Sequence, residues 1–238
     1  MTALPQAIPE NWCLTPLAPD LSLDCDAPPP CLDAETELRI EAIWQSARLR
    51  HPDLYNGRVF CLSSMSETQL SGFWCEYRWV LARMKSEPPD ILQGLRPLAV
   101  TALLLCRDGV VLGRRSRESL YLPGYWQGVP AGSVESRDGG EAIDLRAQLL
   151  EELAEEVGLA SAVETEGPLL ACEHARTGIV DLGFLIRSAL DFASVEKAWA
   201  ETANREYDRL TCIAYRDLPD FSDAVLPTTR ALLDRITP

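Results

Sequence analysis

The pattern of apolar residues in the first part of the chain predicts two helices and a strand behind an extended arm. Residues 34–50 carry apolar side chains at i, i+3, i+4 and i+7, which is the spacing of one helix face. These positions are Ile40, Ile43, Trp44 and Ala47. Residues 67–85 also predict a helix, and the turn signal Asn56-Gly57 predicts a strand directly after it. Residues 1–32 are rich in proline and predict the arm.

From residue 97 onward the apolar residues form short continuous runs, which are typical of buried strands. The runs at 98–106 and 110–116 flank the turn sequence "RDG" and predict a hairpin. Residues 141–157 predict a helix with one apolar stripe, which ends at Gly158. Further predicted elements are strands at 168–175, 179–188 and 210–218 and helices at 195–203 and 228–237. We therefore predict an N-terminal region over residues 1–96 and a second unit over residues 97–238.

Charge and cysteine usage narrow the classes of function. The formal net charge of −14 argues against a nucleic-acid partner, because binding to phosphate backbones needs a basic face. The eight cysteines form no CxxC pair and there are only two histidines, so a zinc site of the usual kind has little support. The first residues do not resemble a signal peptide, and no apolar run is long enough to cross a membrane. We expect a cytoplasmic protein with reduced thiols, most of them small core residues, and no membrane partner.

The predicted helix at 141–157 contains the acidic stretch "LLEELAEEVGL". At about 100° per residue, Glu152, Glu155 and Glu156 fall within one quadrant of this helix, away from its apolar stripe. Hard cations such as Mg²⁺ take carboxylate oxygens as ligands, and a bound cation would relieve the repulsion. The alternative is a solvated acidic face, since glutamate is a good helix former.

The surroundings of this stretch resemble the signature of the Nudix hydrolases, G-x5-E-x7-R-E-U-x-E-E-x-G-U, where U is a bulky apolar residue. "EELAEEVGL" aligns with its last nine places, and "VPAGSVE" upstream is similar to its entry. The resemblance covers residues 97–238. It implies an α/β/α sandwich with a mixed sheet, preceded here by a smaller α+β N-terminal region. It also implies that Glu152, Glu155 and Glu156 are catalytic ligands of Mg²⁺ or Mn²⁺, together with the carbonyl of Gly132.

The chain departs from that signature in two ways. Glu151 stands where the family usually has an arginine that orients the ligand glutamates, and Arg146 is a candidate substitute. The interval from Gly132 to Glu151 is also five positions longer than in the signature. Glu141 is our first candidate for the first glutamate of the signature, and Glu135 is the alternative.

The resemblance implies hydrolysis of a nucleoside diphosphate linked to another group, giving a nucleoside monophosphate and a phosphorylated product. The segment "IWQSARLRHPDLYNGRVFCL" is similar to one that precedes the Nudix domain in UDP-sugar pyrophosphatase-like members, which favours a nucleotide sugar. The alternative is a catalytically silent Nudix-fold module that binds a nucleotide or nucleotide sugar. The sequence is compatible with a homodimer.

Four residues outside the acidic helix are candidates for substrate binding. Arg114, Arg115 and Arg117 form a basic cluster whose planar side chains suit phosphate oxygens, unless all three are solvated at the end of a strand. Trp126 could stack on a base, although core packing is the commoner role for such a residue.

Hydrolysis also needs a general base that accepts a proton from the attacking water. Glu173 and Glu206 are candidates outside the acidic helix. The sequence does not decide between them.

Overall fold

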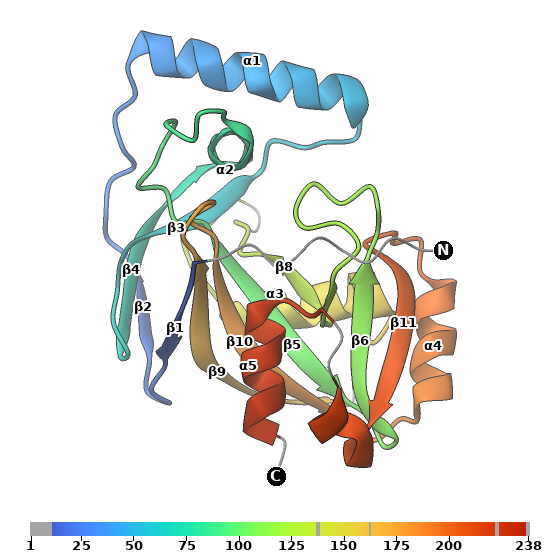
Figure 1. Cartoon of the computed structure of the whole chain (residues 1–238). Helices are drawn as coiled ribbons and strands as arrows, with labels where there is room; N and C mark the ends of the chain where they lie inside the picture. Colours follow the sequence, from blue (N-terminus) through green and yellow to red (C-terminus); the bar gives the residue numbers. More distant parts are fainter. Residues whose placement is uncertain (1–10, 137–138, 162, 222–223, 237–238) are drawn as a thin grey trace.

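The computed structural model describes residues 11–136, 139–161, 163–221 and 224–236. Residues 1–10 of the predicted arm and the last residue of the predicted terminal helix lie outside this range. The described part contains one large sheet and one small sheet (Figure 1). The large sheet consists of β1 (Trp12–Pro16), β5 (Leu98–Leu105), β6 (Gly109–Arg115), β7 (Trp126–Gly128), β8 (Ala131–Ser133), β9 (Val163–His174), β10 (Val180–Ser188) and β11 (Tyr207–Ala214).

The large sheet is mixed, and two of its strands, β5 and β6, diverge along their length. Its main strand order is β1-β9-β10-β5-β6-β11, with β10 parallel to β5 and the other neighbours antiparallel. β5 and β6 pair only next to their shared turn, where Leu104 and Leu105 face Val111 and Val110. Further along, β5 pairs with β8 and β6 pairs with β7, so that the two strands diverge.

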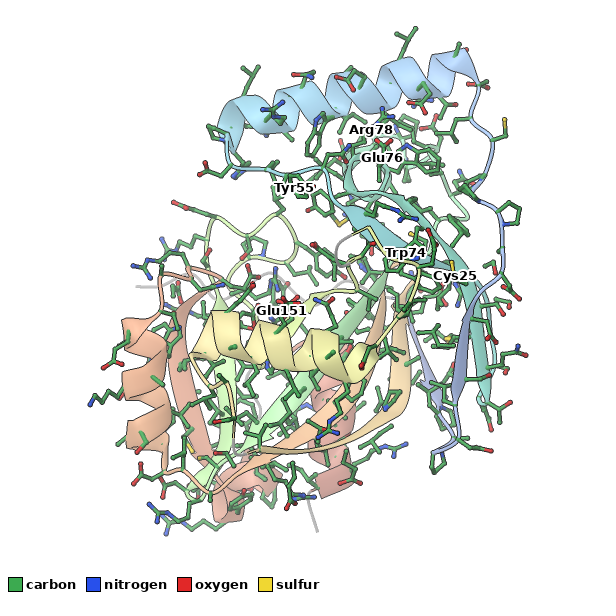
Figure 2. All side chains as sticks on the ribbon, turned by 180° about the vertical axis from the view of Figure 1, so that it is seen from behind. Cys25, Tyr55, Trp74, Glu76, Arg78 and Glu151 are labelled. Atoms are coloured by element: carbon green, nitrogen blue, oxygen red, sulfur yellow. The ribbon has the colours of Figure 1, made fainter. Side chains whose placement is uncertain are left out.

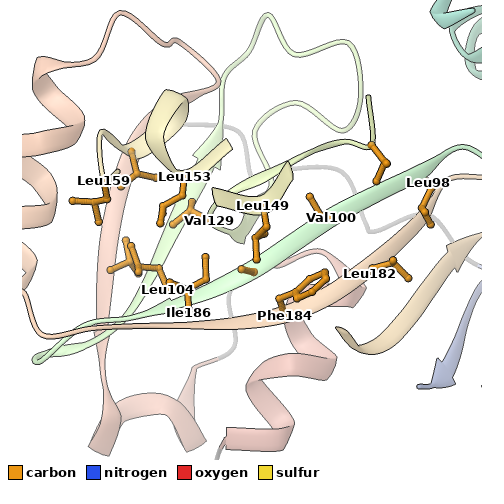
Figure 3. Packing of buried hydrophobic residues seen from close by; sticks show 14 of the residues in the cluster. Leu98, Val100, Leu104, Val129, Leu149, Leu153, Leu159, Leu182, Phe184 and Ile186 are labelled. Atoms are coloured by element: carbon orange, nitrogen blue, oxygen red, sulfur yellow. The ribbon is translucent and has the colours of Figure 1, made fainter. Parts of the chain in front are cut away.

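Helices cover both faces of this sheet. On one face α3 (Leu145–Glu152) and α4 (Phe192–Glu201) bury Leu149 and Val195 against a cluster that includes Val100, Leu104 and Phe184 (Figure 3). On the other face α5 (Pro227–Ile236) packs Leu232 and Leu233 against a second cluster. The chain is therefore an α/β protein with a mixed sheet between helical layers, which confirms the predicted fold class.

Apart from β1, which belongs to the large sheet, the N-terminal region forms a second layer that lies above the large sheet in Figure 1. Its small sheet has the order β2-β4-β3, with β2 (Ser22–Cys25), β3 (Arg58–Met65) and β4 (Gln69–Glu76). Two helices, α1 (Ala34–Arg50) and α2 (Tyr77–Lys85), pack on each other through Ile40, Trp44 and Leu81. Arg78 of α2 pairs with Glu76 and with Glu37 of α1, beside the buried apolar contacts (Figure 2).

The helix predicted at 34–50 is confirmed, but two helix predictions were partly wrong. Residues 67–85 begin as strand β4, whose Gly72 lies so close to the Cys61 carbonyl that an added Cβ would meet it at 2.2 Å. The helix predicted at 141–157 starts only at Leu145, because the Asp144 side chain caps it by accepting from the Ala147 amide. Its last part, Leu153–Val157, is a π-helical turn.

Three other expectations need correction or comment. The strand predicted directly after Asn56-Gly57 is confirmed as β3, and the Asn56 side chain accepts a hydrogen bond from the Arg78 amide at the start of α2. Half of the cysteines are buried, whereas Cys13, Cys25 and Cys31 are exposed. Among the described residues, no helix has the length and apolar character needed to cross a membrane.

Candidate active site

A cavity of about 660 Å³ lies where β5 and β6 diverge. Its lining comes from β5, β8, α3 and the loop after β6, and from Tyr77, Val80 and Met84 of α2. The N-terminal layer therefore supplies one wall of the cavity. Figure 2 shows the α3 region, marked by Glu151, facing this layer. Three of the four predicted ligands, Gly132, Glu152 and Glu156, line the cavity.

Glu156 is almost completely buried, with 4% of its surface exposed. Its Oε2 accepts a hydrogen bond from the Ala131 amide at 3.0 Å and another from the Tyr207 hydroxyl at 2.8 Å. Desolvation raises the pKa of Glu156 well above its ordinary value, and the nearby charge of Glu152 raises it further. The hydrogen bonds thus fix the carboxylate in position, while the neighbouring charges that act on it, Glu152 and Glu206, are of the same sign.

Glu152 is held beside it at the end of α3. Its Oε1 accepts from the Gln148 side chain at 2.8 Å. Burial raises the pKa of Glu152 to about 7, even though this hydrogen bond lowers it. A Cβ added at Gly132 would lie 2.1 Å from the Glu152 carboxyl group, so the glycine allows the carboxylate to approach the backbone of β8.

The third predicted ligand, Glu155, is exposed and is not among the residues that line the cavity. Glu155 and Glu156 follow each other in the π-helical turn, one exposed and the other buried, and the charge of Glu155 still raises the pKa of Glu152. Glu135, in contrast, lines the cavity, and its pKa is raised by desolvation and then by the charges of Glu155 and Glu151.

Glu141, the first candidate for the first glutamate of the signature, lies away from the other predicted ligands. It is exposed and forms an ion pair with Arg58 at 2.8 Å, outside the cavity. The alternative, Glu135, lies with Glu152 and Glu156 in the cavity lining. Arg146 is exposed on α3, and Gln148 rather than Arg146 orients Glu152.

The donor set fits a hard divalent cation. The buried carboxylate of Glu156, the half-buried carboxylate of Glu152 and the backbone of Gly132 meet at one wall, and oxygen donors of this kind suit Mg²⁺ or Mn²⁺. In the described part of the chain, no three His, Cys, Asp or Glu side chains already lie close enough to hold a metal ion. A third protein ligand would therefore require a side-chain rotation, for which exposed Glu155 has the freedom.

The three arginines of the predicted cluster point to different places. Arg115 lines the cavity, donates to the Gln127 side chain at 3.0 Å and pairs with Glu206 at 2.8 Å. Arg114 instead pairs with Asp208 and lies over the Trp126 ring. Arg117 is exposed and lines a neighbouring cavity.

Trp126 does not line the cavity. It packs against the apolar cluster under α5, which agrees with core packing rather than base stacking. The two candidate bases also differ. Glu173 forms a two-point ion pair with Arg96, at 3.0 and 2.7 Å, away from the cavity lining, whereas Glu206 lies in that lining.

Two polar residues of this region were missed by the sequence reasoning. Gln148 is buried and bridges the Glu135 amide and the Glu152 carboxylate, but nothing in the sequence distinguishes it from other helical glutamines. Asp181 is buried in the cavity lining, accepts from the Thr228 hydroxyl, and has a pKa raised by burial to about 6. Its sequence signal was available, because Asp181 interrupts the apolar run of β10.

Comparisons with known proteins give a similarity of fold. No family model matches the sequence, and no curated protein matches it. The MutT protein from Methanosarcina mazei is 18% identical, with 59% of this chain and 92% of that chain covered and a TM-score of 0.43. The NUDIX domain of Shewanella oneidensis NrtR, solved with ADP ribose, is 19% identical over 59% and 85%, with a TM-score of 0.40.

A protein from Deinococcus radiodurans is 12% identical, with 76% of this chain and 99% of that chain covered and a TM-score of 0.49. Several solved structures similar to this chain are thus Nudix proteins. At these identities and TM-scores the likeness does not fix the family.

Proposed function

We propose that the chain is a Nudix-type hydrolase that cleaves the diphosphate of a nucleoside diphosphate linked to another group, with Mg²⁺ or Mn²⁺ as cofactor. A nucleotide sugar is the substrate we favour, because of the sequence resemblance in the N-terminal region. The products would be a nucleoside monophosphate and a phosphorylated group.

One observation carries this proposal. Glu152 and Glu156 are both desolvated in the cavity, and the charges that act on them in the described part of the chain are carboxylates, which raise their pKa values further. Two neighbouring desolvated carboxylates are costly unless a cation accompanies them. A divalent cation bound by both would remove that cost and would bring the diphosphate to the same wall.

When bound, the cation would neutralise the diphosphate and lower the pKa of a water molecule. The chain itself supplies orientation. The Ala131 amide and the Tyr207 hydroxyl hold the Glu156 carboxylate, and Gln148 holds Glu152. Arg115, which is fixed by Gln127 and Glu206, presents a guanidinium group for a phosphate oxygen. Glu206 is the favoured acceptor of the water's proton, because it lies in the cavity lining and Glu173 does not.

The test is a panel of nucleoside diphosphate compounds incubated with Mg²⁺ or Mn²⁺, with the products identified by chromatography. We expect at least one compound to give a nucleoside monophosphate, and a chelator to stop the reaction. Glu156→Gln should reduce turnover at least 100-fold, since such electrostatic groups typically contribute about that much. A Glu156→Gln enzyme with wild-type turnover would exclude the assignment.

The second candidate function is a binding module without turnover. The exposed position of Glu155 favours it, because an enzyme of this kind is expected to use this glutamate as a third ligand. Binding of a compound from the same panel, measured by calorimetry without any product, would support this candidate.

A further inference from the structure

A second cavity of about 520 Å³ adjoins the first. It lies between α1, α2 and residues 117–120, the segment after β6. Four residues line both cavities, namely His51, Glu118, Ser119 and Leu120. The two cavities are therefore direct neighbours that share one stretch of wall.

The two cavities have opposite charge. The ionisable acidic and basic side chains of the first cavity are Asp53, Glu118, Glu135, Glu152, Glu156, Asp181 and Glu206, with Arg115 and Arg205. Those of the second cavity are Arg50, Lys85 and Arg117, with Glu118. A basic cavity is unexpected in a chain whose formal net charge is −14. The chain therefore has an acidic cavity, which suits a cation, directly beside a basic cavity, which suits an anion.

The positive charge of the second cavity is poorly compensated. The pKa of Lys85 is lowered by burial and then by the charges of Arg50 and Arg176. Lys85 donates to the Leu120 carbonyl at 2.7 Å, which fixes its position. Within the described residues, Arg117 forms no ion pair, and the buried Ser119 hydroxyl has no hydrogen-bond partner.

Helix ends explain only part of this charge. Arg50 and Lys85 lie in the last turns of α1 and α2, where basic residues interact favourably with the helix dipole. Arg117 lies on the loop after β6, so it gains nothing from a helix end. Its presence on the opposite wall makes three cations converge on one space, together with an unpartnered hydroxyl.

We propose that the second cavity binds an anionic substituent of the group attached to the nucleoside diphosphate. The substrate would then be a nucleoside diphosphate compound with a further phosphate or carboxylate beyond the diphosphate. The acidic cavity would take the diphosphate through its cation, and Arg50, Lys85 and Arg117 would take the second anion directly. This inference rests on the proposed function and narrows its substrate class.

The first test measures binding of inorganic phosphate in the presence of a chelator. Without a cation the acidic cavity repels phosphate, so binding reports on the basic cavity. We expect millimolar binding that weakens with salt, and an increase in Kd of about fivefold for Arg117→Gln, as for a partly exposed ion pair. Arg48→Gln is the matched control, because Arg48 lies in the same last turn of α1 as Arg50 but outside both cavities.

The second test compares hydrolysis of three compounds in the holoenzyme: a nucleoside diphosphate sugar, its uronate and its sugar phosphate. We expect KM to be at least tenfold lower for one of the two anionic compounds than for the nucleoside diphosphate sugar. Whether the uronate or the sugar phosphate has the lower KM identifies the anion. Arg117→Gln should make the KM values of the neutral and the anionic compounds equal. Lys85→Met should have the same effect, and it serves as the test if Arg117→Gln does not fold. Hydrolysis with equal KM values in all three cases would overturn the inference and leave the proposed function intact.

The two proposals can thus fail separately. If no compound is hydrolysed but phosphate binding still depends on Arg117, the basic cavity is an anion site and the hydrolase assignment fails. If Arg117→Gln binds phosphate as tightly as Arg48→Gln does, the anion site is refuted whatever the hydrolysis shows.

Discussion

Glu152 and Glu156 carry the chemistry that we assign to this chain, and their surroundings are set by a few small contacts. The sequence predicted both residues from their spacing, because a helical repeat fixes which positions share a side. It did not predict Gln148 as the partner of Glu152, nor Tyr207 as the partner of Glu156. Tyr207 lies 51 positions away in the chain, and only tertiary structure brings such residues together.

The Glu152 carboxyl lies so close to Gly132 that a larger residue at this position should disturb the site. Gly132→Ala places a methyl group 2.1 Å from the Glu152 carboxyl, which must then move away from β8. Because that carboxyl is the end of a flexible side chain, we expect stability to fall by only about 1 kcal/mol. Turnover should fall at least tenfold. The control is Gly94→Ala, where an added Cβ meets nothing within 4 Å, and equal turnover in both variants would contradict the role of Gly132.

Asp181 predicts how stability depends on pH. Its folded pKa of about 6 lies above the ordinary value of 3.8, so between these values the folded protein holds a proton that the unfolded chain has lost. The contribution of Asp181 to stability is therefore fully present below pH 3.8 and is lost as the pH rises through 6.

Asp181→Asn should remove that loss. At pH 7.5 we expect the variant to be more stable than the wild type by on the order of 2 kcal/mol, and at pH 3.5 the difference should vanish. Urea unfolding at the two pH values measures this. A difference that is the same at both pH values would show that Asp181 does not titrate as described.

At the scale of elements, the strand predictions succeeded where apolar runs were long and continuous, as in β5, β6 and β10. They failed for β4, because its aromatic and small residues are compatible with either a helix or a strand. Only the pairing with β3 makes this segment a strand. The π-helical turn at the end of α3 was also unpredictable. A sequence pattern with a period of 3.6 residues contains no information about a local change of helix type.

The cap of α3 should matter more for the site than an equal cap elsewhere. Asp144→Ala removes the side-chain bond to the Ala147 amide, and Asp33→Ala removes the same kind of bond at the start of α1. Each loss should lower the free energy of unfolding by about 1 kcal/mol. We expect only Asp144→Ala to weaken Mn²⁺ binding, since α3 carries Gln148 and Glu152. Calorimetric titration of both variants measures this, and equal metal affinities would contradict it.

For the whole molecule, the N-terminal layer is part of the site rather than an appendage. Its helix α2 lines the first cavity with Tyr77, Val80 and Met84, and α1 and α2 both line the second cavity. The sequence predicted that these residues form a separate region, but the placement of that region over the sheet depends on long-range contacts such as the bridge between Val59 and Glu135.

Weakening this layer should therefore affect both stability and substrate binding. Ile40 is fully buried between α1 and α2, and Ile40→Ala should lower the free energy of unfolding by about 2–5 kcal/mol. We also expect KM to rise severalfold, because the wall formed by α2 becomes less well ordered. Thermal unfolding and steady-state kinetics test this, with the exposed Leu49→Ala as a control on the same helix. A destabilised Ile40→Ala enzyme with unchanged KM would show that the N-terminal layer does not contribute to substrate binding.

Mn²⁺ titration followed by electron paramagnetic resonance tests whether Glu152 and Glu156 bind a divalent cation. The wild type should bind Mn²⁺, with Mg²⁺ competing for the same site. The double variant Glu152→Gln, Glu156→Gln should lose this binding while keeping its fold, because both substitutions preserve volume and remove a desolvated charge. Mn²⁺ binding of equal affinity in the double variant and the wild type would contradict the assignment.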